Sequence, residues 1–139
     1  MNGSAGTFLE MDEGNRFSRG HPSIHVLPAV LAYAEAHGAS GAAVMSALLT
    51  VYEVGSRIGA AANMRGAMHP HGTWGTVGAA AGVARLAGFD AARMREAINV
   101  ASSLTTASSK KTMLEGGLVR NFYAGVSNQM GLLAVTLVE

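Results

Sequence analysis

Small residues dominate one segment and constrain how the chain can fold. Between residues 73 and 87, Gly75, Gly78, Ala79 and Gly82 follow one another at spacings of three and four. Residues at these spacings share one face of a helix. Because they carry little or no side chain, a second helix can approach that face closely. The segment therefore predicts a helix over about 73–87 that packs tightly against other helices.

The rest of the chain shows helical patterns and no strand alternation. Ser40 and Asp90 are placed to cap helices, and Gly38 is placed to end one. Pro28 falls inside a helical segment, where we expect it to be tolerated because it lies near the first turn. We expect one partial all-α domain over residues 1–139, with about five to six packed helices. The expected helices cover about 3–11, 23–37, 40–62, 73–87, 91–104 and 119–138, with a polar break from Ser102 through Lys111.

Composition excludes several functional classes. The formal net charge is +1 and the basic residues form no stripe, so nucleic-acid binding is not expected. Cysteine is absent, which excludes disulfides and thiolate chemistry. No apolar run approaches the roughly 20 residues of a membrane span, and the N-terminus lacks a signal-peptide pattern, so we expect a cytoplasmic protein. Only 14% of the residues are charged, which suggests that a partner covers part of the surface.

Four of the five histidines form two close pairs. His69 and His71 directly precede the expected 73–87 helix, whose first turn offers free N–H groups and a positive dipole end. This junction is suited to holding and deprotonating an anion. His21 and His25 have the spacing of metal ligands, but they lack the glutamate of a zinc hydrolase. We therefore expect no metal, a loop position for His21 and a partly buried helical position for His25.

Charged side chains complete the candidate site. Three carboxylates precede the first histidine pair: Glu10, Asp12 and Glu13. A carboxylate hydrogen-bonded to an imidazole fixes its tautomer and raises its basicity. Three cations lie beside serine, threonine and glycine residues: Lys110, Lys111 and Arg120. Such cations are suited to gripping carboxylates, although a solvated loop and ordinary surface charges are the alternatives.

Several short motifs occur in a characteristic order. They are Asn2-Gly3-Ser4-Ala5-Gly6, Leu9-Glu10-Met11-Asp12-Glu13-Gly14, Gly20-His21-Pro22-Ser23 followed by Val26-Leu27-Pro28-Ala29, His69-Pro70-His71-Gly72-Thr73, and Val119-Arg120-Asn121-Phe122-Tyr123-Ala124-Gly125. This ordered set resembles the MmgE/PrpD family and covers nearly the whole chain. The family includes 2-methylcitrate dehydratase, cis-aconitate decarboxylase and iminodisuccinate epimerase.

The resemblance has implications for architecture and for the site. It implies an all-α domain that pairs with a smaller α/β lid domain in a homodimer, with no metal or organic cofactor. Family members are considerably longer, so the chain is expected to be a fragment of the helical domain without the lid. His21 and His69 match the two active-site histidines of the family.

Two motifs depart from the family pattern. Where many members have Asp-aromatic-Asp-Asp-Thr, this chain has residues 10–14, which keep the carboxylates but end in Gly14 and lose the threonine hydroxyl. Where those members have Lys-Pro-Leu-His, this chain has residues 120–123, which begin with Arg120. Arginine can hold a carboxylate bidentately but cannot donate a proton at neutral pH. Both departures argue against decarboxylase activity.

The resemblance and the residues together predict cofactor-independent dehydration of a small di- or tricarboxylic acid such as 2-methylcitrate. This elimination needs a base, an acid for the leaving hydroxyl, and cations for the carboxylates. The expected catalytic residues are His21, His69 and Asp12, with Asp12 orienting His21 and the order of acid and base open. The expected substrate-binding residues are Arg120, Lys111, Thr73 and Glu10. The alternatives are an epimerase or decarboxylase on the same scaffold, and a truncated, non-catalytic helical interaction module.

Overall fold

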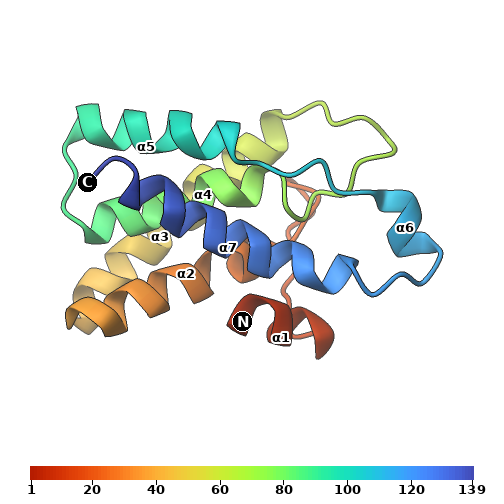
Figure 1. The fold of residues 1–139 in the computed structure, drawn as a ribbon, viewed down its shortest axis with the longest axis horizontal. Helices are drawn as coiled ribbons and strands as arrows, with labels where there is room; N and C mark the ends of the chain where they lie inside the picture. The colour runs from red at the N-terminus through yellow and green to blue at the C-terminus, as the bar shows by residue number, and fades with distance from the viewer.

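The computed structural model describes residues 1–139 and confirms the all-α prediction. Its seven helices are α1 (Asn2–Phe8), α2 (Pro22–His37), α3 (Gly41–Ala61), α4 (Trp74–Leu86), α5 (Ala91–Ser103), α6 (Lys110–Leu114) and α7 (Arg120–Thr136) (Figure 1). The short helix α6 exceeds the predicted number and lies where the polar break was expected to end. Ser109 caps it by accepting the Thr112 N–H at 3.1 Å. No helix combines the length and apolar character needed to cross a bilayer.

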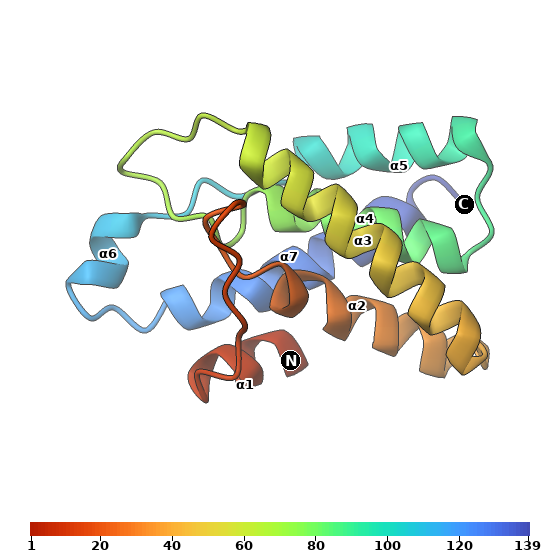
Figure 2. The same ribbon diagram turned by 180° about the vertical axis from the view of Figure 1, so that it is seen from behind.

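Helix α4 is the central element of the bundle. It packs against α2, α3, α5 and α7, and Figures 1 and 2 show it enclosed between α3 on one side and α7 on the other. Every residue from His71 to Ala84 is buried. A helix buried on all sides must be apolar all round, which alanine, glycine and valine satisfy here. The predicted tight packing of this segment is therefore observed.

Glycine sets the close approach of α4 and α7. A Cβ at Gly131 in α7 would meet the Ala79 side chain and lie 2.9 Å from the Ala80 backbone nitrogen in α4. Backbone atoms in a packed helix cannot move aside individually, so only glycine allows this spacing of the two helices.

Pro28 is tolerated for a different reason from the one predicted. Helix α2 begins at Pro22, so Pro28 lies inside the helix and cannot donate to the Ile24 carbonyl one turn back. Asn128 of α7 replaces that donor, because its Nδ2 donates to Ile24 O at 2.9 Å. Its Oδ1 also accepts the Ala29 N–H at 2.8 Å. The expectation that position in the first turn would suffice was wrong.

One further helix boundary differs from the prediction and bears on the site. Helix α1 ends at Phe8 rather than Met11, because Glu10 adopts a left-handed φ of +53° and turns the chain. Ser40 and Asp90 cap α3 and α5 as predicted, accepting the N–H groups of Ala43 and Arg93. The turn at Glu10 directs residues 10–13 toward the N-terminal end of α2.

We predict that Gly131→Ala lowers the free energy of unfolding by about 1–3 kcal/mol, because the added methyl forces α4 and α7 apart. Urea denaturation measures this change. Gly41→Ala is the control, since a Cβ there meets nothing within 4 Å. Its free energy of unfolding should be unchanged or higher. An equal loss in both variants would show that the helix spacing is not set at Gly131.

We predict that Asn128→Leu costs about 2–4 kcal/mol, because it leaves the Ile24 carbonyl and the Ala29 N–H buried without partners. Pro28→Ala restores a backbone donor to Ile24. The cost of Asn128→Leu should therefore fall by about 1 kcal/mol in the Pro28→Ala background. A double-mutant cycle by urea denaturation measures this coupling, and strict additivity of the two changes would contradict the explanation.

Candidate active site

The loop before α4 is held in place by the segment before α6. His69 N–H donates to Ser108 O at 2.9 Å, and Thr106 N–H donates to Gly72 O at 2.9 Å. The Ser108 hydroxyl donates to the carbonyls of His69 and His71. Gly72 has a φ of +87°, which only glycine adopts readily. The stretch predicted as a simple polar break therefore positions both histidines.

Four imidazoles gather at the N-terminal end of α4. The His71 ring lies at their centre, with its centroid 4.7 Å from His21, 4.7 Å from His25 and 4.5 Å from His69, each in an edge arrangement. His25 enters the cluster because Gly75 leaves room for its ring. His25 is fully buried, more so than predicted, and both of its ring nitrogens lack partners, as do those of His71.

Burial keeps three of these rings neutral. Desolvation, helped by His21 and His69, lowers the pKa of His25 to about 3. Desolvation is again the largest cause for His69, followed by the charges of Arg120, His21 and Lys110, and its pKa falls to about 4. The pKa of His71 is lowered still further, mainly by burial. These imidazoles are therefore uncharged at neutral pH.

His21 is oriented so that one ring nitrogen can act as a base. It lies on the loop side of α2, as predicted, and forms the N-cap position. Its Nδ1 lies 2.6 Å from Glu13 O and 3.2 Å from Asp12 O. Carbonyl oxygens only accept, so Nδ1 carries the proton and the lone pair of neutral His21 is on Nε2. The Asp12 carboxylate, 3.6 Å from Nδ1, stabilises the ring when Nε2 takes a second proton.

His69 is held in the other neutral tautomer. Its Nδ1 accepts the backbone N–H of His71 at 3.1 Å, so the proton of neutral His69 is on Nε2. A neutral imidazole in this tautomer offers an N–H donor to an oxygen that gains negative charge. His21 and His69 therefore present different groups at Nε2, a lone pair in the first and an N–H in the second, a distinction that the sequence left open.

Two of the three acidic residues, Glu10 and Asp12, form ion pairs with Arg120. Arg120 NH1 lies 2.8 Å from Glu10 Oε1, and NH2 lies 3.5 Å from Asp12 Oδ2. The Asp12 side chain is only 2% exposed, whereas that of Glu10 is 71% exposed. Glu13 accepts the Ser23 N–H at 2.9 Å at the start of α2, and burial raises its pKa. Arg120 therefore holds Asp12 beside His21, and its guanidinium is already engaged by protein carboxylates.

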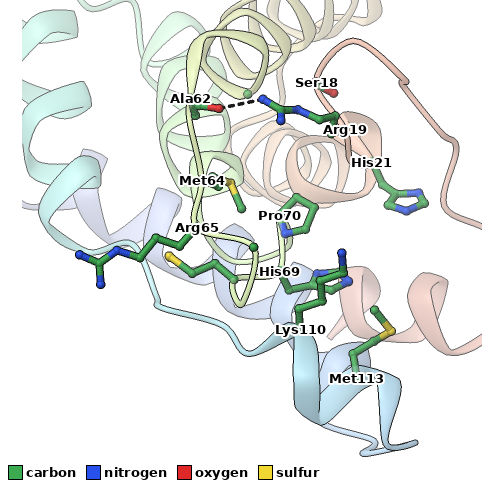
Figure 3. A pocket seen from close by; sticks show the side chains of 13 residues that line it. Ser18, Arg19, His21, Ala62, Met64, Arg65, His69, Pro70, Lys110 and Met113 are labelled. Carbon is green, nitrogen blue, oxygen red and sulfur yellow. Dashed lines mark hydrogen bonds between the residues drawn. The ribbon is translucent and has the colours of Figure 1, made fainter.

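A cavity of about 380 Å³ opens beside His21 and His69 (Figure 3). Its lining also includes Arg19, Arg65 and Lys110, and no aspartate or glutamate. A volume of this size suits a small ligand. The cavity therefore joins the two candidate histidines, His21 and His69, to a positively charged wall.

Two predicted binding residues lie outside this lining. Lys111 is exposed, and its Nζ lies 3.6 Å from Oε1 of Glu115, the residue that follows α6. The preceding residue, Lys110, lines the cavity. The Thr73 hydroxyl donates to Pro70 O at 2.5 Å and faces a second hollow of about 370 Å³. The sequence did not predict that Arg19 lines the cavity or that Ser108 supports the histidine loop. The only signal in the sequence was that Arg19 lies near His21 and Ser108 near Lys110 along the chain.

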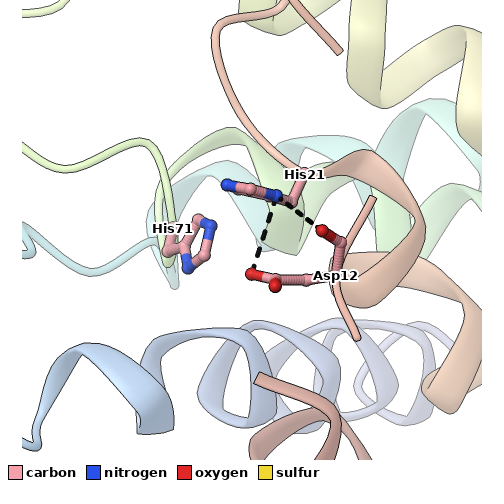
Figure 4. Close-up of side chains that lie close together, drawn as sticks. All are labelled: Asp12, His21 and His71. Carbon is pink, nitrogen blue, oxygen red and sulfur yellow. Dashed lines mark hydrogen bonds and ion pairs between the residues drawn. The ribbon is translucent and has the colours of Figure 1, made fainter. Parts of the chain in front are cut away.

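One group of side chains has the spacing of metal ligands. Asp12, His21 and His71 place donor atoms within 4.8 Å of one another (Figure 4). However, Nδ1 of His21 already donates to the Glu13 carbonyl, and Asp12 faces the positive charge of Arg120. This arrangement fits a polarised imidazole better than a bound cation.

The order of these residues along the chain matches one protein family. The family model described as the MmgE/PrpD N-terminal domain matches residues 1–139. The chain belongs to the MmgE/PrpD family. A comparison with curated proteins gave no match. The match confirms the predicted family and places the four-imidazole cluster within the MmgE/PrpD N-terminal domain.

The lowered pKa values predict acid sensitivity. The unfolded imidazoles titrate near 6.5, whereas folded His25 and His69 stay neutral to about 3 and 4. Below pH 6.5 the unfolded chain binds more protons, so the free energy of unfolding falls as the pH falls. Between pH 7 and 5 each such histidine should contribute a loss of about 2 kcal/mol.

His25→Leu removes one titrating group. Between pH 7 and 5, the free energy of unfolding of this variant should therefore fall by about 2 kcal/mol less than the free energy of unfolding of the parent. Urea denaturation at the two pH values measures the difference. His37→Leu is the control, because His37 is exposed. This variant should show the same pH dependence of the free energy of unfolding as the parent. Identical pH dependence in His25→Leu and the parent would contradict the assignment.

Proposed function

We propose that this MmgE/PrpD domain carries the acid–base residues of a cofactor-independent, cytoplasmic lyase that dehydrates a small di- or tricarboxylic acid such as 2-methylcitrate. The observation that supports it most strongly is the opposite tautomers of His21 and His69 at one cavity. One ring offers a lone pair and the other an N–H. Elimination next to a carboxylate requires both.

In this proposal His21 takes the proton alpha to a carboxylate through Nε2. The adjacent Asp12 carboxylate, held by Arg120, stabilises the imidazolium. His69 donates a hydrogen bond from its Nε2–H to the substrate oxygen on which charge develops, and keeps its proton. The imidazolium of His21 then returns its proton to the departing hydroxyl, so that water leaves and both rings end neutral.

The predicted substrate-binding set changes in this proposal. Lys110 replaces Lys111 as the lysine at the substrate, because it lines the cavity. Arg120 and Glu10 orient Asp12 instead of meeting the substrate directly. Thr73 supports the loop through Pro70.

Epimerisation and decarboxylation begin from related carbanion-like states, so the same two histidines could serve them. The departures at Gly14 and Arg120 continue to argue against the decarboxylase. The non-catalytic alternative gains some support from exposed apolar side chains near the end of α1 and the start of α7: Phe8, Leu9, Met11, Leu118 and Phe122. We propose that this surface is covered in the working enzyme, which the lid domain and homodimer implied by the resemblance would allow.

We predict that His21→Asn and His69→Asn each lower the turnover of 2-methylcitrate by about 10²–10⁴-fold. In His21→Asn the amide N–H can still donate to Glu13 O, and in His69→Asn the amide oxygen can still accept the His71 N–H. Both variants lose the ring Nε2, and with it the lone pair of His21 or the N–H of His69. Ultraviolet absorbance of the conjugated double bond measures the product.

His37→Asn is the matched control, because His37 is exposed and remote from the cavity. It should retain full turnover. Carbon dioxide release or exchange of the substrate proton with solvent deuterium, without alkene formation, would favour the decarboxylase or epimerase. Undiminished turnover in both site variants would contradict the acid–base assignment, and inactivity of the parent chain would favour the interaction module.

A further inference from the structure

The cavity contains a cation that the proposed chemistry does not use. Arg19 lines the cavity with His21 and Lys110, and it has no carboxylate within ion-pair distance. Arg120, by contrast, is engaged by Glu10 and Asp12. Because the lining contains no acidic residue, its positive charges can be neutralised only by an anionic ligand or by solvent ions.

The backbone at Arg19 is constrained. Its φ is +55°, a left-handed conformation that an arginine rarely adopts. The loop that imposes it is closed by paired backbone hydrogen bonds between Asn15 and Gly20. The Asn15 side chain also accepts the N–H groups of Phe17 and Ser18 at 3.0 Å each. Strain of this kind persists where surrounding contacts over-determine it, and it is frequent at ligand sites.

Neighbouring packing fixes the base of the same loop. Ser18 is buried, and a Cβ at Gly59 of α3 would lie 2.9 Å from its Cβ. A Cβ at Gly20 would lie 2.6 Å from the Trp74 ring. The loop is therefore seated against α3 and the start of α4, and Arg19 projects from a rigid support.

The guanidinium keeps most of its donors available. Its NH2 group donates to Ala62 O at 2.9 Å, which orients the side chain across the cavity (Figure 3). Arginine has five N–H donors in a fork that matches a carboxylate. In Figure 3 the guanidinium lies at the Ala62 side of the cavity, while Lys110 extends from the opposite side toward His69.

We propose that Arg19 binds a second carboxylate of the substrate, at the end of the cavity away from Lys110 and His69. It is then a specificity-determining residue that favours polycarboxylates over acids with fewer carboxylates. The reacting end of the substrate lies at His21 and His69, so this role rests on the proposed function. Its test measures binding alone and does not depend on turnover.

The experiment compares two probes that differ by one carboxylate, tricarballylate and glutarate, by isothermal titration calorimetry of the 139-residue chain at about 0.15 M salt. We expect tricarballylate to bind the parent more tightly. Arg19→Gly removes the guanidinium while suiting the left-handed backbone, so the fold should persist by circular dichroism. It should weaken tricarballylate binding by at least about tenfold and change glutarate binding little.

Arg16→Gly is the matched control, because Arg16 is an exposed cation of the same loop that does not line the cavity. It should leave both affinities unchanged. Equal losses in Arg16→Gly and Arg19→Gly, unchanged affinity in Arg19→Gly, or a parent that does not prefer tricarballylate would each overturn the inference. None of these results bears on the acid–base proposal, which the turnover experiment tests. Conversely, an inactive parent that still binds tricarballylate through Arg19 would contradict the acid–base proposal and support the role of Arg19.

Discussion

The burial of α4 from Trp74 to Ala84 is the constraint on which the rest of the structure depends. A helix enclosed on all sides needs neighbours close enough to exclude water, and only small residues permit that approach. Gly131 lets α7 approach, and Gly75 admits the His25 ring. The N-terminal end of this central helix is therefore also interior. Histidines attached to it are desolvated, and their chemistry follows from that position.

Desolvation and hydrogen bonding give the four clustered histidines different protonation and hydrogen-bonding properties. Burial keeps His25, His69 and His71 neutral, whereas His21 stands beside a carboxylate at the cavity wall. A backbone carbonyl accepts a hydrogen bond from Nδ1–H of His21, whereas a backbone N–H donates to Nδ1 of His69. Because these partners belong to the main chain, the tautomers are set by the fold.

Residue types and their order along the chain pointed to candidate side chains, but they could not give the direction in which each side chain points. His21, His69 and Asp12 were found from their types and order, and the structure brings them together. Lys111 was preferred to Lys110, yet of these two lysines only Lys110 lines the cavity, whereas Lys111 lies beside Glu115. Arg120 was expected to face substrate but is held by acidic residues more than 100 positions away.

The sequence by itself determined the helical class, most helix ends and the family, because caps and 3.6-residue periodicity act between residues near one another in the chain. Only the tertiary structure decided what rescues Pro28, which ring nitrogen carries the proton in His21 and in His69, and which cations face the cavity. Those outcomes depend on which distant backbone and side-chain groups become neighbours. Asn128 meets Ile24 across 104 positions, a contact that no local pattern encodes.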